Sequence, residues 1–251
     1  MIETEKYIIF DILNDNNIIN LYTKKPLNIN FHVQSQEELE NRFLEIENEI
    51  NYRFRKVILP RQSHTTNVVC IDEDNLNDEL VDVDGIITNL KGVDLVTSSA
   101  DCQNILIYDK NKKVIASVHS GWKGTLNKIL RNTIYIMQNK YECSSDDLII
   151  CIEPSILKCC FEVEEDVVLS FKNNFENIDE FITLGDIKDN KQKYYIDTIG
   201  INKMELLSLG VLKKNIFVAE ICTKCNNDKF HSYRADGKDA GRNIALICIN
   251  D

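Results

Sequence analysis

The chain is short of the residues that usually separate structural units. Its 251 residues include three prolines and nine glycines, and no stretch is rich in serine, glycine or proline. No internal repeat with a period of about 20 to 50 residues is evident. Because a chain of this length can bury a sizeable core, the lack of a linker and of a repeat predicts one continuous domain over residues 1–251.

Long apolar runs and an excess of positive charge are also missing. No segment approaches the roughly 20 apolar residues of a membrane span, and residues 1–6 lack the basic-then-apolar order of a signal peptide. The formal net charge of −11 argues against a nucleic-acid partner, because binding to a phosphate backbone needs a basic surface. We therefore expect a cytoplasmic protein that binds neither a membrane nor nucleic acid. A small anion held by a few local cations is compatible with this charge.

Cysteine, in contrast, is abundant. Nine cysteines without an export signal indicate reduced thiols, and their odd number rules out a complete set of internal disulfides. Cys222 and Cys225 form a CxxC motif, but the chain has no second one. Cys159 and Cys160 do not have the spacing that completes a common structural zinc site. We expect these four to be unpaired reduced thiols.

Apolar periodicity predicts strands and helices mixed along the whole chain. Ser35 and Glu38 form a capping-box pattern that opens a helix over residues 35–50, and Gly210 is expected to terminate another helix. Helices are also predicted at residues 126–137, 167–175 and 200–209, and the last of these is the helix that Gly210 ends. Strands are predicted at residues 7–10, 18–23, 56–59, 66–71, 148–152, 215–220 and 244–249. With the hairpin described next, this pattern predicts a layered α/β or α+β fold.

Two apolar segments, residues 105–108 and 113–118, flank a polar turn and predict a hairpin near the middle of the chain. If Tyr108 pairs with Lys113, then Cys102 falls opposite His119. Directly opposed residues have Cβ atoms about 5 Å apart on one face, so this thiol and imidazole could share a metal ion or a proton. A slip of one residue would put them on opposite faces.

A metal site is one interpretation of these residues. His64, in the polar loop 61–65, would complete a His–Cys–His set that suits zinc and leaves the fourth position for water or substrate. Copper binds the same ligand types. The alternative is structural: Cys102 is then a small buried apolar residue and His64 an ordinary loop residue. Periodicity alone does not bring His64 to the other two.

Two segments could bind an anion. Residues 120–124 lead from a strand into a helix, whose unpaired N–H groups favour anions, and Lys123 adds a positive charge. Residues 230–242 gather three cations, Arg234 among them, and one imidazole in a glycine-bearing loop. An ordinary strand-to-helix turn and surface ion pairing are the structural alternatives.

Several motifs now occur in one order: QSH at 62–64, VDGIIT at 83–88, SADC at 99–102, VHSGWKG at 118–124, CFEV at 160–163, ICT at 221–223 and SYR at 232–234. They resemble the YfiH/YlmD family, also described as the laccase-domain or multicopper polyphenol oxidoreductase family. The resemblance runs from about residue 31 to the end. It departs from the family at three places, since Lys123 replaces the usual arginine, Glu153 a glycine and Asn104 a proline.

The resemblance implies a single-domain α/β/β/α fold with mixed sheets and a zinc site, with copper as the alternative, on the catalytic residues His64, Cys102 and His119. It implies phosphorolysis of adenosine, inosine and methylthioadenosine, with adenosine deaminase activity beside it. The partners would be a purine nucleoside and phosphate, in a monomer or homodimer. In such a site we expect Lys123, Arg234 and Asp101 to contact substrate or phosphate.

Three rival hypotheses remain. In the first, copper replaces zinc and the protein oxidises phenols. In the second, Cys102 is a nucleophile activated by His119, as in a hydrolase or amidase. In the third, the metal braces the fold of a protein that is not an enzyme.

Overall fold

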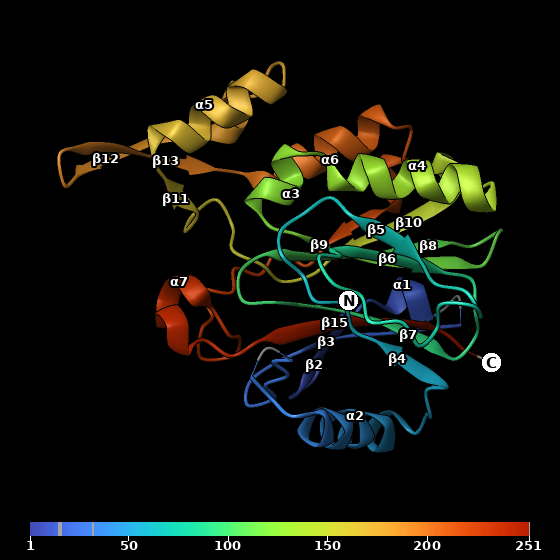
Figure 1. Ribbon diagram of the computed structural model, residues 1–251. Helices are drawn as coiled ribbons and strands as arrows, with labels where there is room; N and C mark the ends of the chain where they lie inside the picture. The colour runs from blue at the N-terminus through green and yellow to red at the C-terminus, as the bar shows by residue number, and fades with distance from the viewer. Residues whose placement is uncertain (15–16, 32, 251) are drawn as a thin grey trace.

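The chain folds into four layers in the order helix, sheet, sheet, helix (Figure 1). The computed structural model describes residues 1–14, 17–31 and 33–250. Two six-stranded sheets pack face to face, and helices cover their outer faces. The helices are α1 (Asp11–Asn14), α2 (Gln36–Ile50), α3 (Trp122–Leu126), α4 (Ile129–Tyr141), α5 (Glu165–Asn174), α6 (Thr198–Ser208) and α7 (Tyr233–Asp236). This arrangement confirms the predicted layered α/β fold with mixed sheets.

The first sheet lies against α2. In spatial order its strands are β1 (Ile2–Glu3), β2 (Tyr7–Ile9), β3 (Ile18–Thr23), β15 (Asn243–Ile249), β7 (Val93–Ser99) and β4 (Lys56–Ile58). All pairs are antiparallel except β4 with β7. Phe43 and Ile46 of α2 pack on Leu21 and Leu246 of the sheet. The capping box at Ser35 is present as predicted.

The second sheet lies between the first sheet and the helices α4 and α6. In spatial order its strands are β14 (Ile216–Val218), β10 (Leu148–Ile152), β8 (Gln103–Asp109), β9 (Val114–Ser120), β6 (Gly85–Thr88) and β5 (Val68–Cys70). Its two outermost pairs, β14 with β10 and β5 with β6, are parallel. Alternate residues along β9 face opposite ways. Ile115 joins the core between the sheets, whereas Ala116 joins the core under the helices.

A small third sheet, which the sequence pattern did not predict, lies beside the layers with α5 (Figure 1). Its strands are β11 (Glu162–Val163), β13 (Lys191–Ile196) and β12 (Ile182–Lys188). Several residues of β12 are exposed and its register shifts between Leu184 and Ile187, so the segment lacks the regular alternation that marks a half-buried strand. Phe171 of α5 and Ile196 of β13 belong to its separate apolar core.

The central hairpin forms as predicted, but its register differs by two residues. Tyr108 pairs with Ile115, and Asn104 lies opposite His119 in place of Cys102. The turn is shifted because the Asp109 carboxylate accepts hydrogen bonds from the backbone N–H groups of Asn111 and Lys112 at 2.9 Å. Since side chains alternate with a period of two, a shift of two residues keeps Cys102 on the same face as His119.

The helix predicted at residues 126–137 is divided in two. α3 ends at Leu126 and α4 begins at Ile129. Lys128 takes a left-handed conformation with φ 61°, which interrupts the run of helical dihedral angles. The apolar face of the predicted helix is nevertheless confirmed, because Leu130, Thr133 and Met137 are buried.

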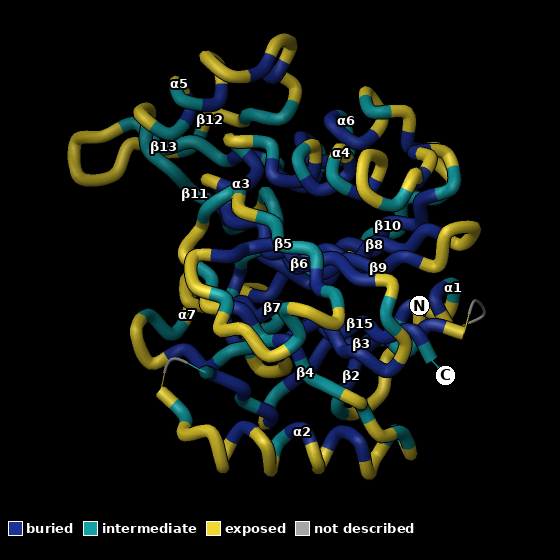
Figure 2. Tube along the Cα trace, turned by 45° about the vertical axis from the view of Figure 1, so that its right-hand side comes forward, coloured by how far each residue is buried: buried dark blue, intermediate teal, exposed yellow. Residues whose placement is uncertain are grey.

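Burial follows the layers (Figure 2). Every residue of β7, β8, β9 and β15 is buried, whereas the outer face of α2 and the long loops are exposed. Within the described ranges, no helix has both the length and the apolar character that crossing a membrane requires.

Candidate metal centre and pocket

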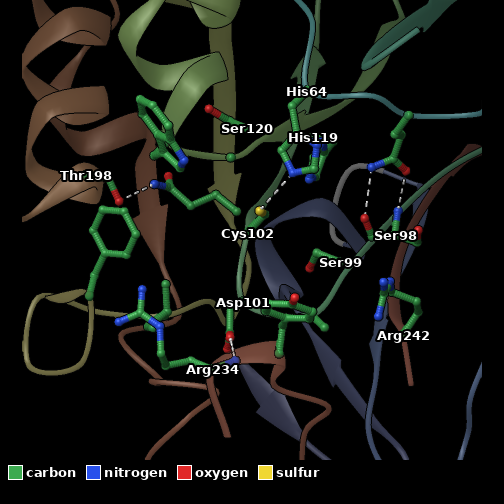
Figure 3. Close-up of a pocket in the computed structure, with 18 residues that line it drawn as sticks. His64, Ser98, Ser99, Asp101, Cys102, His119, Ser120, Thr198, Arg234 and Arg242 are labelled. Atoms are coloured by element: carbon green, nitrogen blue, oxygen red, sulfur yellow. Dashed lines mark hydrogen bonds between the residues drawn. The ribbon is translucent and has the colours of Figure 1, made fainter. Parts of the chain in front are cut away.

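Three of the predicted site residues meet at one end of the space between the two large sheets. His64 comes from the loop between β4 and β5, Cys102 from the residue before β8, and His119 from β9. One ligand atom from each lies within 4.8 Å of the other two. The Sγ atom of Cys102 is 3.7 Å from Nε2 of His64, and the two imidazole rings are nearly perpendicular with centroids 4.9 Å apart (Figure 3).

Asp84, the residue before β6, holds the His64 loop and the end of β9 in place. Its carboxylate accepts hydrogen bonds from the backbone N–H groups of Ser63, His64 and Thr65, at 2.6 to 3.3 Å. These bonds hold the His64 loop, in which His64 itself has φ 63°. The backbone C=O of Asp84 also accepts from the N–H of His119 at 2.7 Å, which fixes the end of β9.

The same carboxylate orients the His119 ring. Oδ1 of Asp84 lies 2.8 Å from Nδ1 of His119. Burial disfavours the charged carboxylate, but hydrogen bonds from His119 and Thr65 outweigh burial and lower the pKa of Asp84 to about 2. Because Asp84 is then ionised, Nδ1 of His119 donates to it. The other nitrogen, Nε2, is then the one that could bind a metal ion, once it has given up its own proton.

The thiol and the imidazole form a mutually stabilised charge pair. Burial opposes ionisation of both groups. For Cys102, the His119 ring first and His64 second overcome burial and lower the pKa of the thiol to about 6. For His119, Asp84 and then Cys102 overcome it and raise the pKa to about 9. These contacts favour the thiolate of Cys102, which is the form in which cysteine binds metals.

Gly121 leaves the space that the side chains of His64 and Cys102 occupy. A Cβ atom at this position would lie 2.7 Å from Cδ2 of His64, closer than such atoms approach one another, and a tight 3.0 Å from Sγ of Cys102. Its φ of −70° is accessible to any residue, so it is the ligand set that excludes a side chain here. Close packing at Gly121 therefore helps to place His64 beside Cys102.

The ligand set fits a metal ion. One sulfur and two imidazole nitrogens are the donors that zinc prefers, and three protein ligands are typical of catalytic zinc sites. The Asp84–His119 bond is the outer contact that usually fixes a metal-bound imidazole. A His₂Cys set also suits copper, so the donors alone do not distinguish the two metals.

A cavity of about 330 Å³ lies over this site. Its size is at the lower end of the range for small-molecule pockets, about 300 to 1,000 Å³. Both large sheets contribute, through Ser98 and Ser99 of β7 (Figure 3) and through Gln103 of β8. Aromatic side chains line it at Trp122, Phe161 and Tyr233, and polar ones at Gln62, Thr198, Arg234 and Arg242.

The residues predicted to contact substrate or phosphate do not all lie at the pocket. Arg234 lines the pocket, and its Nη1 donates to the backbone C=O groups of Cys160 and Glu162 at 3.0 and 3.1 Å. Lys123 is exposed on α3, with its ammonium 5.7 Å from the centroid of the Trp122 ring, and it is not among the lining residues. A phosphate contact from Lys123 stays a prediction.

Asp101 lines the pocket, but both of its carboxylate oxygens already have partners. Oδ1 accepts from the hydroxyl of Thr223 and Oδ2 from the backbone N–H of Arg234, both at 2.6 Å. Asp101 has φ 96°, an unusual conformation for a residue other than glycine. These contacts join three segments around the pocket, and a direct contact of Asp101 with substrate stays a prediction.

Sequence reasoning missed several lining residues. Ser98 and Thr198 belong to no recognisable motif. They could not be found from the sequence, because only the tertiary fold brings β7 and α6 to this pocket. Arg242 could have been found, since it belongs to the basic segment at residues 230–242 that suggested Arg234.

Glu153, which replaces a glycine of the family, is buried and is not among the lining residues. Burial raises the pKa of Glu153 well above the ordinary value.

Fold and site together define a class: an α/β/β/α protein with a pocket lined by a His–Cys–His group that could hold a metal ion. A family model described as multi-copper polyphenol oxidoreductase laccase matches residues 20–250, and the chain belongs to this family. The resemblance predicted from the sequence motifs is thereby confirmed.

Individual relatives carry names of two activities. The chain is 35% identical over 203 residues to a purine nucleoside phosphorylase of Bacteroides thetaiotaomicron, covering 78% of this chain and 74% of the relative. It is 30% identical over 198 residues to an adenosine deaminase of an unknown prokaryotic organism, covering 76% of this chain and 74% of the relative. Among solved structures, the hypothetical protein YfiH of Bacillus licheniformis has a TM-score of 0.89 and 21% identity, covering 99% of this chain and 98% of that one. These relatives indicate an enzyme, and YfiH confirms the fold.

Proposed function

We propose that this chain catalyses the phosphorolysis of purine nucleosides such as adenosine, inosine and methylthioadenosine, with zinc as cofactor and adenosine deamination as a second activity. The observation that carries the proposal is the convergence of the ligand atoms of His64, Cys102 and His119 within 4.8 Å at the pocket floor. The names of the two relatives support the reaction class.

His64, Cys102 and His119 would hold the metal, each through one atom. A zinc ion bound there would supply Lewis-acid polarisation and lower the pKa of a bound water. Asp84 keeps the proton on Nδ1 of His119, so that Nε2 is the nitrogen that would lose its proton and bind the metal. The Cys102 side chain is partly exposed toward the pocket, which leaves room beside it for a further ligand.

In phosphorolysis, a phosphate oxygen forms a bond to C1′ of the sugar while the bond from C1′ to the purine nitrogen breaks. The bonding electron pair leaves with the purine, which gains a proton, and ribose 1-phosphate is the other product. Arg234 and Arg242 place two cations at the pocket, and a guanidinium binds phosphate oxygens in pairs. Trp122 and Phe161 offer aromatic faces against which a purine can stack.

In deamination, the oxygen of water bonds to the purine carbon that carries the amino group, and ammonia leaves with the electrons of the broken bond. Zinc deaminases carry out this substitution with related histidine and cysteine ligands. Both reactions require the same base-binding space, so we expect phosphate to decide only what happens to the sugar.

Two rival activities each rest on one observation. The family description supports a copper-dependent oxidase, which would consume oxygen with a phenol substrate. The lowered pKa of Cys102, about 6, supports a thiol hydrolase in which Cys102 is the nucleophile. Metal content after growth without added copper distinguishes the first from our proposal. Activity of the fully chelated protein distinguishes the second.

The test is to incubate the purified chain with adenosine or inosine, with and without phosphate. We expect adenine, hypoxanthine and ribose 1-phosphate with phosphate, and inosine from adenosine without it. His119→Ala and Cys102→Ala should form none of these products. Cys70→Ala is the matched control, because Cys70 is a half-buried thiol in β5 outside the ligand set. Absence of nucleoside turnover by the zinc-loaded chain would refute the proposal.

A further inference from the structure

A second group of potential metal ligands lies outside the pocket floor. Cys159 and Cys160 follow β10, and Cys222 and Cys225 follow β14. One sulfur from each lies within 4.8 Å of the other three. The sequence interpretation, which rejected this group on its spacing, missed the meeting because a backbone bridge between Ser155 and Cys222 aligns the two segments only in the folded chain.

We propose that Cys159, Cys160, Cys222 and Cys225 bind one zinc ion as a structural site, separate from the His64–Cys102–His119 site. Sγ of Cys225 lies 3.4 Å from that of Cys160 and 3.7 Å from that of Cys159. A tetrahedral ion with Zn–S bonds of about 2.3 Å has sulfurs about 3.8 Å apart, so these separations suit four sulfurs around one centre.

Competing arrangements of four thiols fit the geometry less well. A [2Fe–2S] cluster also takes four cysteines, but it divides them between two irons and so needs a wider spread of sulfurs. A disulfide pairs two sulfurs, whereas Cys225 lies close to both Cys159 and Cys160. One ion bound by all four sulfurs accounts for both of these short sulfur–sulfur distances.

The surroundings support the binding of an ion at this place. Four thiolates around Zn²⁺ leave two negative charges. Lys158 and Lys224 stand next to the ligands in the sequence and supply positive charge in an otherwise acidic chain.

The proposed ion would brace one side of the pocket. The backbone C=O of Cys160 accepts from the Arg234 guanidinium at 3.0 Å. Thr223, between two of the cysteines, donates to the Asp101 carboxylate at 2.6 Å. Both cysteine segments thus contact residues that line the pocket, so an ion that joins these segments would hold Arg234 and Phe161 in place without touching substrate.

The test compares zinc content and thiol reactivity in full-length variants purified under reducing conditions. Cys159→Ala/Cys225→Ala removes the two exposed ligands and spares the buried Cys222. We expect it to bind one zinc ion fewer per chain than the wild type and to have a clearly lower Tm. Cys70→Ala is the control and should match the wild type. Cys102→Ala should still bind one zinc ion, so that failure of the first site and failure of the second are distinguishable.

Two measurements on chains that retain all four cysteines guard against misfolding of the double variant. Cobalt added to chelated Cys102→Ala should give the strong charge-transfer and visible bands of a tetrahedral tetrathiolate. In the wild type, Cys159 and Cys225 should react slowly with a thiol reagent despite their exposure, and rapidly after chelation. Four results would each overturn the proposal. They are equal thiol-reaction rates before and after chelation, disulfide bonds between these cysteines in the purified protein, bound iron with acid-labile sulfide, and an unchanged zinc count in the double variant.

Discussion

The two groups of metal-ligating side chains differ in how the fold holds them. In the first group, Cys102 and His119 lie at the ends of buried strands, whereas His64 is an exposed residue of a loop that Asp84 holds. This group borders a cavity. The four-cysteine group lies on loops, and two of its members are exposed. Three ligands beside a cavity suit chemistry, whereas four ligands without an open position suit stabilisation. We therefore expect the first group to be catalytic and the second to be structural.

The largest expected effect breaks the His64–Cys102–His119 site alone. Gly121→Ala places a methyl group 2.7 Å from Cδ2 of His64, so the imidazole must move and the ligand set separates. We expect loss of one zinc ion per chain and a fall in nucleoside turnover of at least about 100-fold, as for a misplaced catalytic group. Zinc analysis and product chromatography measure the two effects.

Gly124→Ala provides the matched control for this variant. A methyl group at Gly124, also in this segment, would meet its nearest neighbours at an ordinary 3.4 Å. Zinc content and turnover should stay at wild-type values. Equal losses in both variants would show that the methyl group harms the helix rather than the ligand set.

A smaller effect is expected from Asp84→Asn, which keeps the three proposed ligands but weakens the hydrogen bonds that position them. The amide of asparagine offers one acceptor in place of a charged pair of oxygens, so His119 and the His64 loop lose part of their anchoring. We expect zinc affinity at this site to fall about 10- to 100-fold, the usual cost of losing such an outer contact. Competition with a chromogenic chelator measures the affinity.

Asp82→Asn is the control for the Asp84 variant, because Asp82 is a nearby exposed acid. The affinity of the four-cysteine site should be the same in both variants. A parallel loss at the two sites in Asp84→Asn would mean that they are not independent.

The smallest effect concerns Glu153, a buried carboxyl that follows β10. Among the described residues, neither carboxylate oxygen has a hydrogen-bond partner, and burial raises its pKa well above the ordinary value of 4.5. The folded chain therefore keeps a proton that the unfolded chain releases. As the pH rises above 4.5, this group should reduce the free energy of unfolding by about 1.4 kcal/mol per pH unit until it ionises in the fold.

Glu153→Gln removes this titration, so its stability relative to the wild type should increase between pH 5 and pH 6. Denaturant unfolding at the two pH values, with zinc held at a fixed excess, measures the difference. A stability difference that does not change with pH would contradict the assignment of a protonated Glu153.

Local features of this fold were predictable from the sequence, and contacts between distant segments were not. The capping box at Ser35 and the strands β3 and β10 depend on neighbouring residues and lie where they were predicted. The hairpin register differed by two because the Asp109 side chain shifts the turn. Cys102 and His119 still met, since that shift preserves the face of each strand.

The candidate site shows the same division. The sequence placed His64 at the metal only through a family resemblance, because nothing in its own loop reveals Asp84, the residue that holds that loop. The four cysteines were dismissed for a similar reason. Their two segments are adjacent only through the pairing of Ser155 with Cys222, which no local spacing reveals.

The most direct test measures inosine phosphorolysis and zinc content in parallel on Cys102→Ala and Cys159→Ala/Cys225→Ala. Both variants should bind one zinc ion per chain. We predict that the double variant still forms hypoxanthine and ribose 1-phosphate, whereas Cys102→Ala forms neither. Phosphorolysis by Cys102→Ala at the wild-type rate would contradict the assignment of the reaction to the His64–Cys102–His119 pocket.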